Sequence, residues 1–469
     1  MMFLVAAMAL QTALSPSLEK RMDSTIAKLQ HQPGFVGCEV AVSRGNRLVY
    51  VKSAGLASRG THRKVANSDR FSIGSITKQF TSACILKLAE DGKLALDDPL
   101  VKYIPSVTNS DRMTLRQLMQ HVAGLPDYYP LEYMKEEMTR PTTGALILEK
   151  YGRMPLDFEP GTRWSYSNTN YTALGEVIEK VSGMPIAQFM RERLFRPLGL
   201  AHTSFEAHPQ KATGIAQGYA SLGIDPLYPT DGEGDNWCGA AGAIVTTAED
   251  LAKWDIALAS GAALSKDSLA QMTTTARLKS GVRTTYGCGL HVGYSKKARF
   301  WEHGGGTMGF VSENLVLPDK GIAVVVLTNS TQTSPEDTAW EITSGLTGGA
   351  QSKPDPEPKA AAPTRPVPRV TGLKADAAAR RLLGALPHGR VDRSRLTSDF
   401  NAYLSERKLK LVASHLRKCG PLGAIKLKST VERGGMEVAV FSIEFGGKAR
   451  DAYMYREPNG RIAELYIIQ

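Results

Sequence analysis

Cysteine is scarce in this chain and is scattered along it. No two cysteines have Cys-x-x-Cys spacing, and the five among 469 residues are Cys38, Cys84, Cys238, Cys288 and Cys419. An odd number in this distribution indicates neither a disulfide framework nor a zinc site, and it leaves at least one thiol unpaired. We expect no metal ion and no cofactor.

Long hydrophobic runs are also scarce. Residues 1–14 are apolar except for Gln11 and Thr12, but a membrane-spanning helix needs about 20 apolar residues. No other stretch could span a bilayer. The 1–14 segment resembles a secretory signal, although no Lys or Arg precedes it, and the alternative is an N-terminal extension. We expect a periplasmic or secreted protein, with a cytoplasmic one as the alternative.

An excess of positive charge is missing from most of the chain, despite a net charge of +11. Residues 1–350 hold 35 basic and 34 acidic side chains, whereas residues 351–469 hold 22 and 12. The basic excess thus belongs to the tail, where it predicts at most contact with an anionic surface. The sequence has no helix-turn-helix, zinc module or aromatic-basic pattern, so we expect no nucleic-acid partner.

Helix-plus-hairpin patterns occur at both ends of residues 15–350. The first combines a helix over 15–32 with strands over 38–42 and 48–51, and the second combines strands over 310–317 and 322–327 with a helix from Pro335. The region between them is mostly helical, and Thr114 to Gln117 has the spacing of a capping box. These patterns predict an α+β fold, in which an antiparallel sheet built from both chain ends carries flanking helices and a helical region.

A second, smaller domain follows a proline-rich segment. Residues 351–369 contain six prolines, which predicts an extended linker over 351–371. Residues 372–469 are predicted to form a small basic α+β domain, with helices over 375–386 and 397–417 and strands over 424–431, 436–445, 448–456 and 461–468. This order of elements resembles the nuclear-transport-factor-like family.

Three short motifs in residues 15–350 could carry chemistry. In Ser75-Ile76-Thr77-Lys78, a helix that starts at the serine would place Lys78 one turn further along the same face. Lysine can accept the serine proton only when its pKa is lowered. The same Ser-x-x-Lys spacing occurs at Ser17 and at Ser405, so the alternative is a helix-capping serine with a solvated lysine.

The other two motifs are equally ambiguous when taken singly. Tyr166-Ser167-Asn168 could present a phenol and an amide to the lysine, or it could be an aromatic-packed loop. In His303-Gly304-Gly305-Gly306, the glycines suit a strand edge that a substrate backbone approaches, or they form an ordinary glycine loop.

Read in this order, the three motifs resemble the serine β-lactamase and penicillin-binding-protein family. The resemblance is strongest to its class C branch, which is related to esterases and D-aminopeptidases. Further segments of this chain that resemble family blocks are 120–128, 160–168, 197–200, 239–251 and 303–310. Together they cover about residues 15–347.

The resemblance implies a serine hydrolase that works through an acyl-enzyme. Ser75 would be the nucleophile, Lys78 and Tyr166 the proton-transfer pair, and Asn168 the residue that positions Lys78 and the substrate. The implied oxyanion hole is the backbone N–H of Ser75 with that of Gly306, next to His303 and Gly305. Small molecules or peptides would be the substrates.

One position departs from the family pattern. His303 stands where the antibiotic-hydrolysing members have a lysine, and a histidine of ordinary pKa is mostly neutral at pH 7 and gains a proton toward pH 6. Carboxylate recognition is thereby weakened, so esters, amides or D-amino-acid peptides are better candidate substrates than β-lactams. The alternative function is a covalent acyl sensor, which acylates without turnover.

Overall fold

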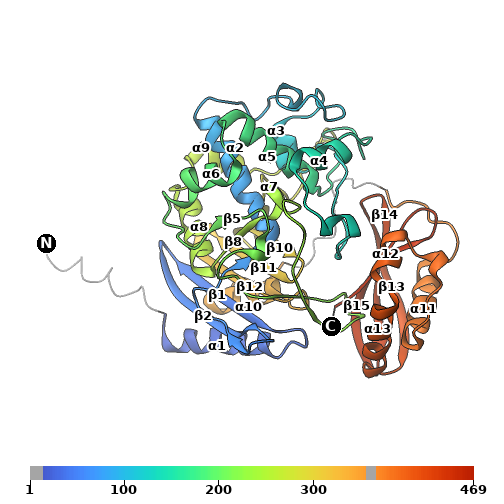
Figure 1. The fold of residues 1–469 in the computed structure, drawn as a ribbon. Coiled ribbons are helices and arrows are strands. Elements are labelled where there is room, and N and C mark those ends of the chain that lie inside the picture. The colour runs from blue at the N-terminus through green and yellow to red at the C-terminus, as the bar shows by residue number, and fades with distance from the viewer. Residues whose placement is uncertain (1–13, 355–365, 469) are drawn as a thin grey trace.

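The computed structural model describes residues 14–354 and 366–468, here called the main domain and the C-terminal domain. The main domain contains a seven-stranded antiparallel sheet of order β3-β2-β1-β12-β11-β10-β9. Its strands come from both ends of the domain, as predicted (Figure 1). They are β1 Gly37–Arg44, β2 Arg47–Ser58, β3 Arg63–Lys64, β9 His291–Ser295, β10 Ala298–Thr307, β11 Phe310–Leu317 and β12 Ile322–Thr328.

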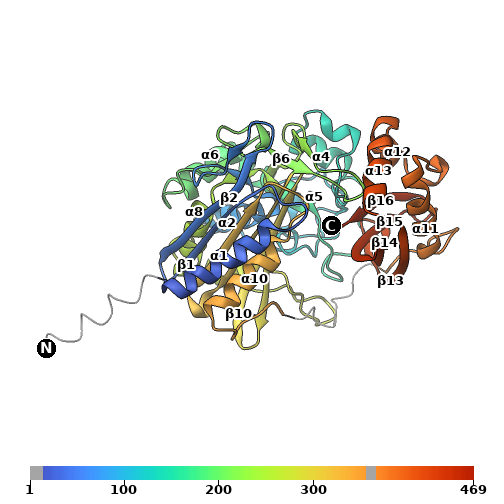
Figure 2. The same cartoon turned by 90° about the horizontal axis from the view of Figure 1, so that it is seen from below.

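Two helices from opposite ends of the domain cover one face of this sheet. Helices α1 (Pro16–Gln30) and α10 (Pro335–Leu346) lie side by side, as Figure 2 shows. Apolar side chains of both helices, among them Ile26 and Trp340, pack on Val40 and Val326 of the central strands. The apolar spacing that predicted these helices thus reflects the face that each one buries.

The helical region covers the other face of the sheet. Its helices are α2 Thr77–Glu90, α3 Leu115–Met119, α4 Gly144–Lys150, α5 Asn168–Ser182, α6 Ile186–Met190, α7 Gly239–Gly242, α8 Ala248–Ser260 and α9 Lys266–Met272. The short strands of this region are β4 Phe71–Ser72, β5 Ser204–Phe205, β6 Gly218–Ala220, β7 Tyr228–Thr230 and β8 Ile244–Thr246. The predicted capping box is confirmed, because Thr114 and Gln117 bond reciprocally at the start of α3. Helix α2 is buried on nearly every side rather than amphipathic.

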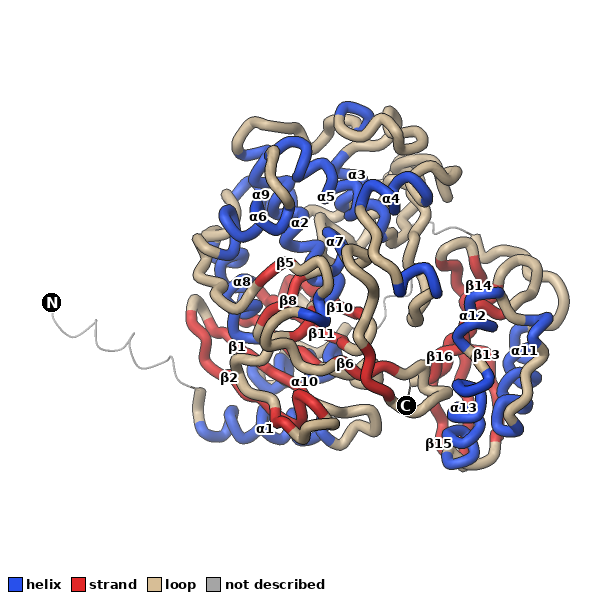
Figure 3. The backbone as a smooth tube through the Cα atoms, viewed as in Figure 1, coloured by secondary structure: helices blue, strands red, loops and turns tan. Residues whose placement is uncertain are grey.

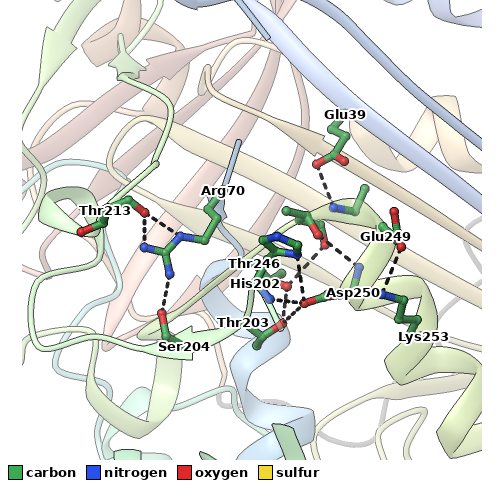
Figure 4. Close-up of polar contacts among 12 residues, drawn as sticks. Glu39, Arg70, His202, Thr203, Ser204, Thr213, Thr246, Glu249, Asp250 and Lys253 are labelled. Atoms are coloured by element: carbon green, nitrogen blue, oxygen red, sulfur yellow. Dashed lines mark hydrogen bonds and ion pairs between the residues drawn. The ribbon is translucent and has the colours of Figure 1, made fainter. Parts of the chain in front are cut away.

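A buried polar network fixes the start of α8 against its neighbours (Figure 4). The Thr247 hydroxyl caps the helix by accepting from the backbone N–H of Asp250. The Asp250 carboxylate in turn accepts from the backbone of His202, just before β5, and pairs with Lys253. From the sheet, Glu39 of β1 accepts from the backbone N–H of Ala248 at 2.9 Å. These bonds tie the helix to both layers around it.

The C-terminal domain packs helices against a four-stranded antiparallel sheet (Figure 3). Its elements are α11 Ala375–Ala385, α12 Ser398–Tyr403, α13 Glu406–Lys418, β13 Leu422–Arg433, β14 Met436–Phe445, β15 Lys448–Arg456 and β16 Ile462–Ile467. The prediction of a single helix over 397–417 is wrong. Helix α12 ends before Leu404, and Ser405 caps the separate helix α13. The Ser405 motif is therefore a helix cap.

Several predicted features fall partly outside the described residues. The predicted signal or extension over 1–14 lies there except for Leu14, and so do residues 355–365 of the predicted linker. The described linker residues, 351–354 and 366–371, form neither helix nor strand. None of the helices in residues 14–354 and 366–468 combines the length and the apolar character that a bilayer span requires. All five cysteines are free thiols.

Candidate active site

Ser75 lies in a short turn of 3-10 helix, Gly74–Ile76, between strand β4 and helix α2. Lys78 follows on the first turn of α2 and is fully buried. Its Nζ donates to Ser75 Oγ at 3.0 Å and to the carbonyl oxygen of Ala241 at 2.8 Å. The predicted pair therefore meets, although the α-helix proper begins two residues later than expected.

Burial decides the protonation of the lysine. Removal from water lowers the pKa of Lys78 to about 7, against a smaller opposing effect from the charge of Asp127. A lysine with this pKa is substantially neutral near physiological pH. The condition that Lys78 must meet to accept a proton is fulfilled by its environment.

Tyr166 brings a phenol to the same serine. Its hydroxyl donates to Ser75 Oγ at 2.8 Å, and its ring packs against His121 with the ring centroids 4.3 Å apart. Burial raises the pKa of Tyr166 above its ordinary value, while the bond to Ser75 opposes that shift. A neutral phenol beside a partly neutral amine can relay a proton between them.

Asn168 is the first residue of α5, and its side chain bridges Lys78 and an acidic residue. Its Oδ1 accepts from Lys78 Nζ at 2.8 Å, and its Nδ2 donates to Asp127 Oδ1 at 3.0 Å. The carboxylate thus fixes which end of the amide faces the lysine. Asp127 lies in the family-like segment 120–128, and no motif spacing indicates its position beside Asn168, which arises from the tertiary structure.

The glycine motif forms one open edge of the main sheet. Strand β9 pairs with β10 only as far as Glu302, whereas β11 continues to pair with β10 up to Thr307. A Cβ atom on Gly305 would lie 2.0 Å from the carbonyl oxygen of Ile73, and one on Gly74 would lie 2.7 Å from Gly306 N. Glycine is therefore needed where β10 passes the Ser75 turn.

His303 is buried and held in one tautomer. Its Nδ1 lies 2.6 Å from the carbonyl oxygen of Gly304 and so carries the proton, which leaves Nε2 to accept from the Tyr286 hydroxyl at 2.8 Å. Burial, with the nearby His291 and Lys78, lowers the pKa of His303 well below 6.5. The expectation that His303 gains a proton toward pH 6 is therefore wrong.

These residues border a pocket of about 520 Å³. Ser75, Tyr166, Asn168, His303 and Gly306 line it, and Gly305 lies behind the strand edge against Ile73. The pocket also has walls that the motifs did not indicate, including two side chains of the C-terminal domain, Arg433 and Tyr466. Across residues 14–354 and 366–468, no group of three or more His, Cys, Asp or Glu side chains is placed to hold a metal ion.

Comparison with known proteins identifies the class to which this fold and site belong. Residues 22–347 match the model of the Beta-lactamase family. The chain belongs to this family. Its relatives include penicillin-binding protein 4* of Bacillus subtilis, 28% identical over 69% of this chain and 73% of that protein. A putative D-alanyl-D-alanine carboxypeptidase of Escherichia coli is 30% identical over 39% of this chain and 46% of that protein.

Solved structures extend the likeness. A D-stereospecific amidohydrolase from Streptomyces aligns with a TM-score of 0.61 and 26% identity, over 71% of this chain and 98% of its own. The octameric penicillin-binding protein homologue from Pyrococcus abyssi aligns at 0.61 and 21% identity over 97% of this chain and 99% of its own. The second alignment shows a shared fold that extends into the C-terminal domain.

Proposed function

We propose that the protein is a serine hydrolase that cleaves esters, amides or D-amino-acid peptides through an acyl-enzyme on Ser75. The observation that carries this proposal is the position of Ser75 Oγ, which is hydrogen-bonded to both Lys78 Nζ and Tyr166 OH. Family membership and hydrolytic relatives support it. A helix-capping serine with a solvated lysine would have neither the burial nor the second partner.

Acylation begins with neutral Lys78 and the Ser75 hydroxyl. The hydroxyl proton moves to Lys78 Nζ while Oγ forms a bond to the substrate carbonyl carbon, which becomes tetrahedral. When the bond to the leaving group breaks, the Tyr166 phenol protonates the leaving group and regains a proton from Lys78. Asn168 keeps Nζ directed at the serine throughout.

Stabilisation of the intermediate and its hydrolysis complete the cycle. The backbone N–H groups of Ser75 and Gly306 would bind the negative oxygen of the intermediate, on the open edge of β10. In deacylation, the same lysine and tyrosine remove a proton from water as its oxygen attacks the ester carbonyl. The Ser75–acyl bond then breaks and the serine recovers its proton.

Intact-mass analysis tests the proposal. We expect a fluorophosphonate probe to add one label to the wild-type protein and none to Ser75→Ala, which should also lose hydrolysis of a p-nitrophenyl ester while staying folded. Ser17→Ala and Ser405→Ala are matched controls with the same Ser-x-x-Lys spacing, and both should stay active. A Ser75→Ala protein that retains most of the wild-type rate would show that the site is misassigned.

The lifetime of the adduct separates turnover from permanent acylation. With a short-chain ester and, separately, a penicillin, we expect an acyl adduct on the wild-type protein that decays as product accumulates. An adduct that forms on Ser75 and persists with both compounds would instead identify an acyl sensor.

A further inference from the structure

The C-terminal domain docks on two main-domain segments that border the catalytic pocket. In the first segment, the Tyr133 hydroxyl donates to the carbonyl oxygen of Ala463 at 3.0 Å. In the second, the buried Asp225 pairs with Lys408 at 2.8 Å, and Leu222 accepts from the backbone N–H of Ile467. The domain is therefore fixed beside the pocket by several separate contacts.

From this position, Arg433 at the end of β13 reaches the pocket that Ser75 lines. Its Nη1 donates to Glu132 Oε1 and to the Tyr455 hydroxyl, both at 3.2 Å. Both bonds use one guanidinium nitrogen, and Nε and Nη2 carry three further N–H donors. The side chain remains 37% exposed, so a molecule in the pocket has access to it.

Arg433 is the one lysine or arginine among the described side chains that line this pocket. The positive charge of Arg433 extends its effect to the site. It lowers the pKa of Tyr166, although burial raises that pKa by more. The lining carboxylates are Glu132 and Glu233, and Glu233 Oε1 accepts from the Tyr129 hydroxyl and from the backbone N–H of Met308. The contact with Glu132 shows that the guanidinium can bind a carboxylate in this position.

We propose that Arg433 is a specificity-determining residue that binds a carboxylate carried by the substrate, so that the C-terminal domain completes the substrate site. The inference rests on the proposed hydrolase function. Neutral His303 supplies no positive charge at the strand edge. A substrate carboxylate is therefore bound by Arg433 of the C-terminal domain instead. The planar fork of arginine matches a carboxylate through two parallel hydrogen bonds.

Two matched substrate pairs test this with the full-length protein. One pair places the charge in the leaving group (3-acetoxybenzoate and its methyl ester), and the other places it in the acyl group (mono-p-nitrophenyl adipate and its methyl ester). In at least one pair, Arg433→Gln should lower kcat/KM for the anion about tenfold or more, mainly through KM. The neutral partner should stay within about twofold of the wild-type value.

Two further variants make the test specific. Lys426→Gln removes the same charge from an exposed position on the same strand. In both pairs it should leave unchanged the ratio of kcat/KM for the anion to kcat/KM for its methyl ester. Glu132→Gln removes the competing carboxylate and should raise the preference for the anion, an effect opposite to that of a general structural loss. If the ratio of kcat/KM for the anion to that for its methyl ester stays at the wild-type value in Arg433→Gln for both pairs, the proposal is overturned. The same holds if this ratio stays at the wild-type value in Glu132→Gln.

A binding measurement separates this inference from the proposed function. In the Ser75→Ala background, calorimetry with 3-acetoxybenzoate should show binding that weakens about tenfold or more when Arg433→Gln is added. If that loss occurs while the wild-type protein hydrolyses nothing, the anion site stands and the hydrolase proposal fails. If hydrolysis through Ser75 occurs but neither binding nor the rate ratios depend on Arg433, only this inference fails.

Discussion

Asn168 Oδ1 lies 2.8 Å from Lys78 Nζ, and the orientation of that amide is set on its other side by Asp127. The three side chains form a chain of hydrogen bonds that ends at Ser75. Asp127 also accepts from the backbone N–H of Asn168 at 3.0 Å, so it holds both the side chain and the start of α5. Through this arrangement Asp127, which has no bond to the serine, orients the side chain that bonds Lys78.

Asp127→Asn should change the pH dependence of the proposed ester hydrolysis as well as its rate. The negative charge of Asp127 opposes the lowering of the pKa of Lys78, so its removal lowers that pKa further. In the proposed mechanism neutral Lys78 is the active form, so kcat/KM should rise with pH through about 7 in the wild type and through a lower pH in the variant.

The measurement is kcat/KM for a neutral ester between pH 5 and 9. We also expect kcat of Asp127→Asn to fall about tenfold to a hundredfold, because the amide of Asn168 loses its fixed orientation. Asp267→Asn, at an exposed position on α9, is the control and should leave the profile in place. If kcat/KM of Asp127→Asn rises at the same pH as that of the wild type, the charge of Asp127 does not affect the pKa of Lys78.

Lys78 and Tyr166 should behave as one proton-transfer unit. Both contact Ser75 Oγ, so Lys78→Ala and Tyr166→Phe are each expected to slow acylation about 10²- to 10⁴-fold. The double variant should be little slower than the slower single variant. Stopped-flow acylation rates measure this, and strictly additive losses would show that the two groups do not share a proton path.

The sequence predicted those features that depend on local or strongly periodic patterns. Hairpins and their flanking helices follow from alternation, turn residues and apolar spacing, and the main sheet was predicted from them. The candidate motif around Ser75 could be singled out because its residues are close in sequence or belong to a family pattern. The break at Ser405 was missed, since the apolar spacing of α12 and α13 reads as one continuous helix.

The features that the sequence did not predict depend on contacts between distant segments. The pKa of His303 depends on burial and on the neighbouring His291 and Lys78, and its tautomer depends on Gly304 and Tyr286. Arg433 approaches the pocket only because the second domain docks beside it. No periodicity or spacing signal connects a residue in the basic tail to a serine more than 350 positions earlier. The predicted contact of the tail with an anionic surface stays a prediction.

Glu39 should make the main domain less stable as pH rises. Burial raises the pKa of Glu39 to about 8, from an ordinary value of 4.5. Between these pH values the unfolded chain loses a proton that the folded chain keeps. The free energy of unfolding is therefore unaffected by Glu39 below pH 4.5, and it falls by about 1.4 kcal/mol per pH unit toward pH 8. Glu39→Gln has no such loss and keeps an acceptor for the Ala248 N–H.

Thermal unfolding at pH 5 and pH 8 measures this effect. The gain in Tm of Glu39→Gln over the wild type should be larger at pH 8 than at pH 5. Glu136→Gln is the control, because the Glu136 side chain is 74% exposed and its charge is not among those that raise the pKa of Glu39. Equal Tm differences at the two pH values would refute the assignment of a buried, neutral Glu39.

His303→Lys should shift selectivity toward an anionic β-lactam. His303 stays neutral from pH 8 to pH 6, because burial, with a smaller effect from His291 and Lys78, holds its pKa well below 6.5. In the wild type, the ratio of kcat/KM for benzylpenicillin to that for p-nitrophenyl acetate should therefore stay flat over this range. Taking the ratio removes the titration of Lys78, which both substrates share.

In His303→Lys this ratio should rise about tenfold, which corresponds to about 1.4 kcal/mol of added transition-state stabilisation. The gain should be larger at pH 6 than at pH 8, because burial near Lys78 also lowers the pKa of the new lysine and leaves it more often charged at low pH. His303→Gln, which stays neutral, is the control and should keep the flat wild-type ratio. A wild-type ratio that climbs toward pH 6 would show that His303 does titrate there. A His303→Lys ratio at or below the wild-type value would show that a missing cation at this strand edge does not limit β-lactam hydrolysis.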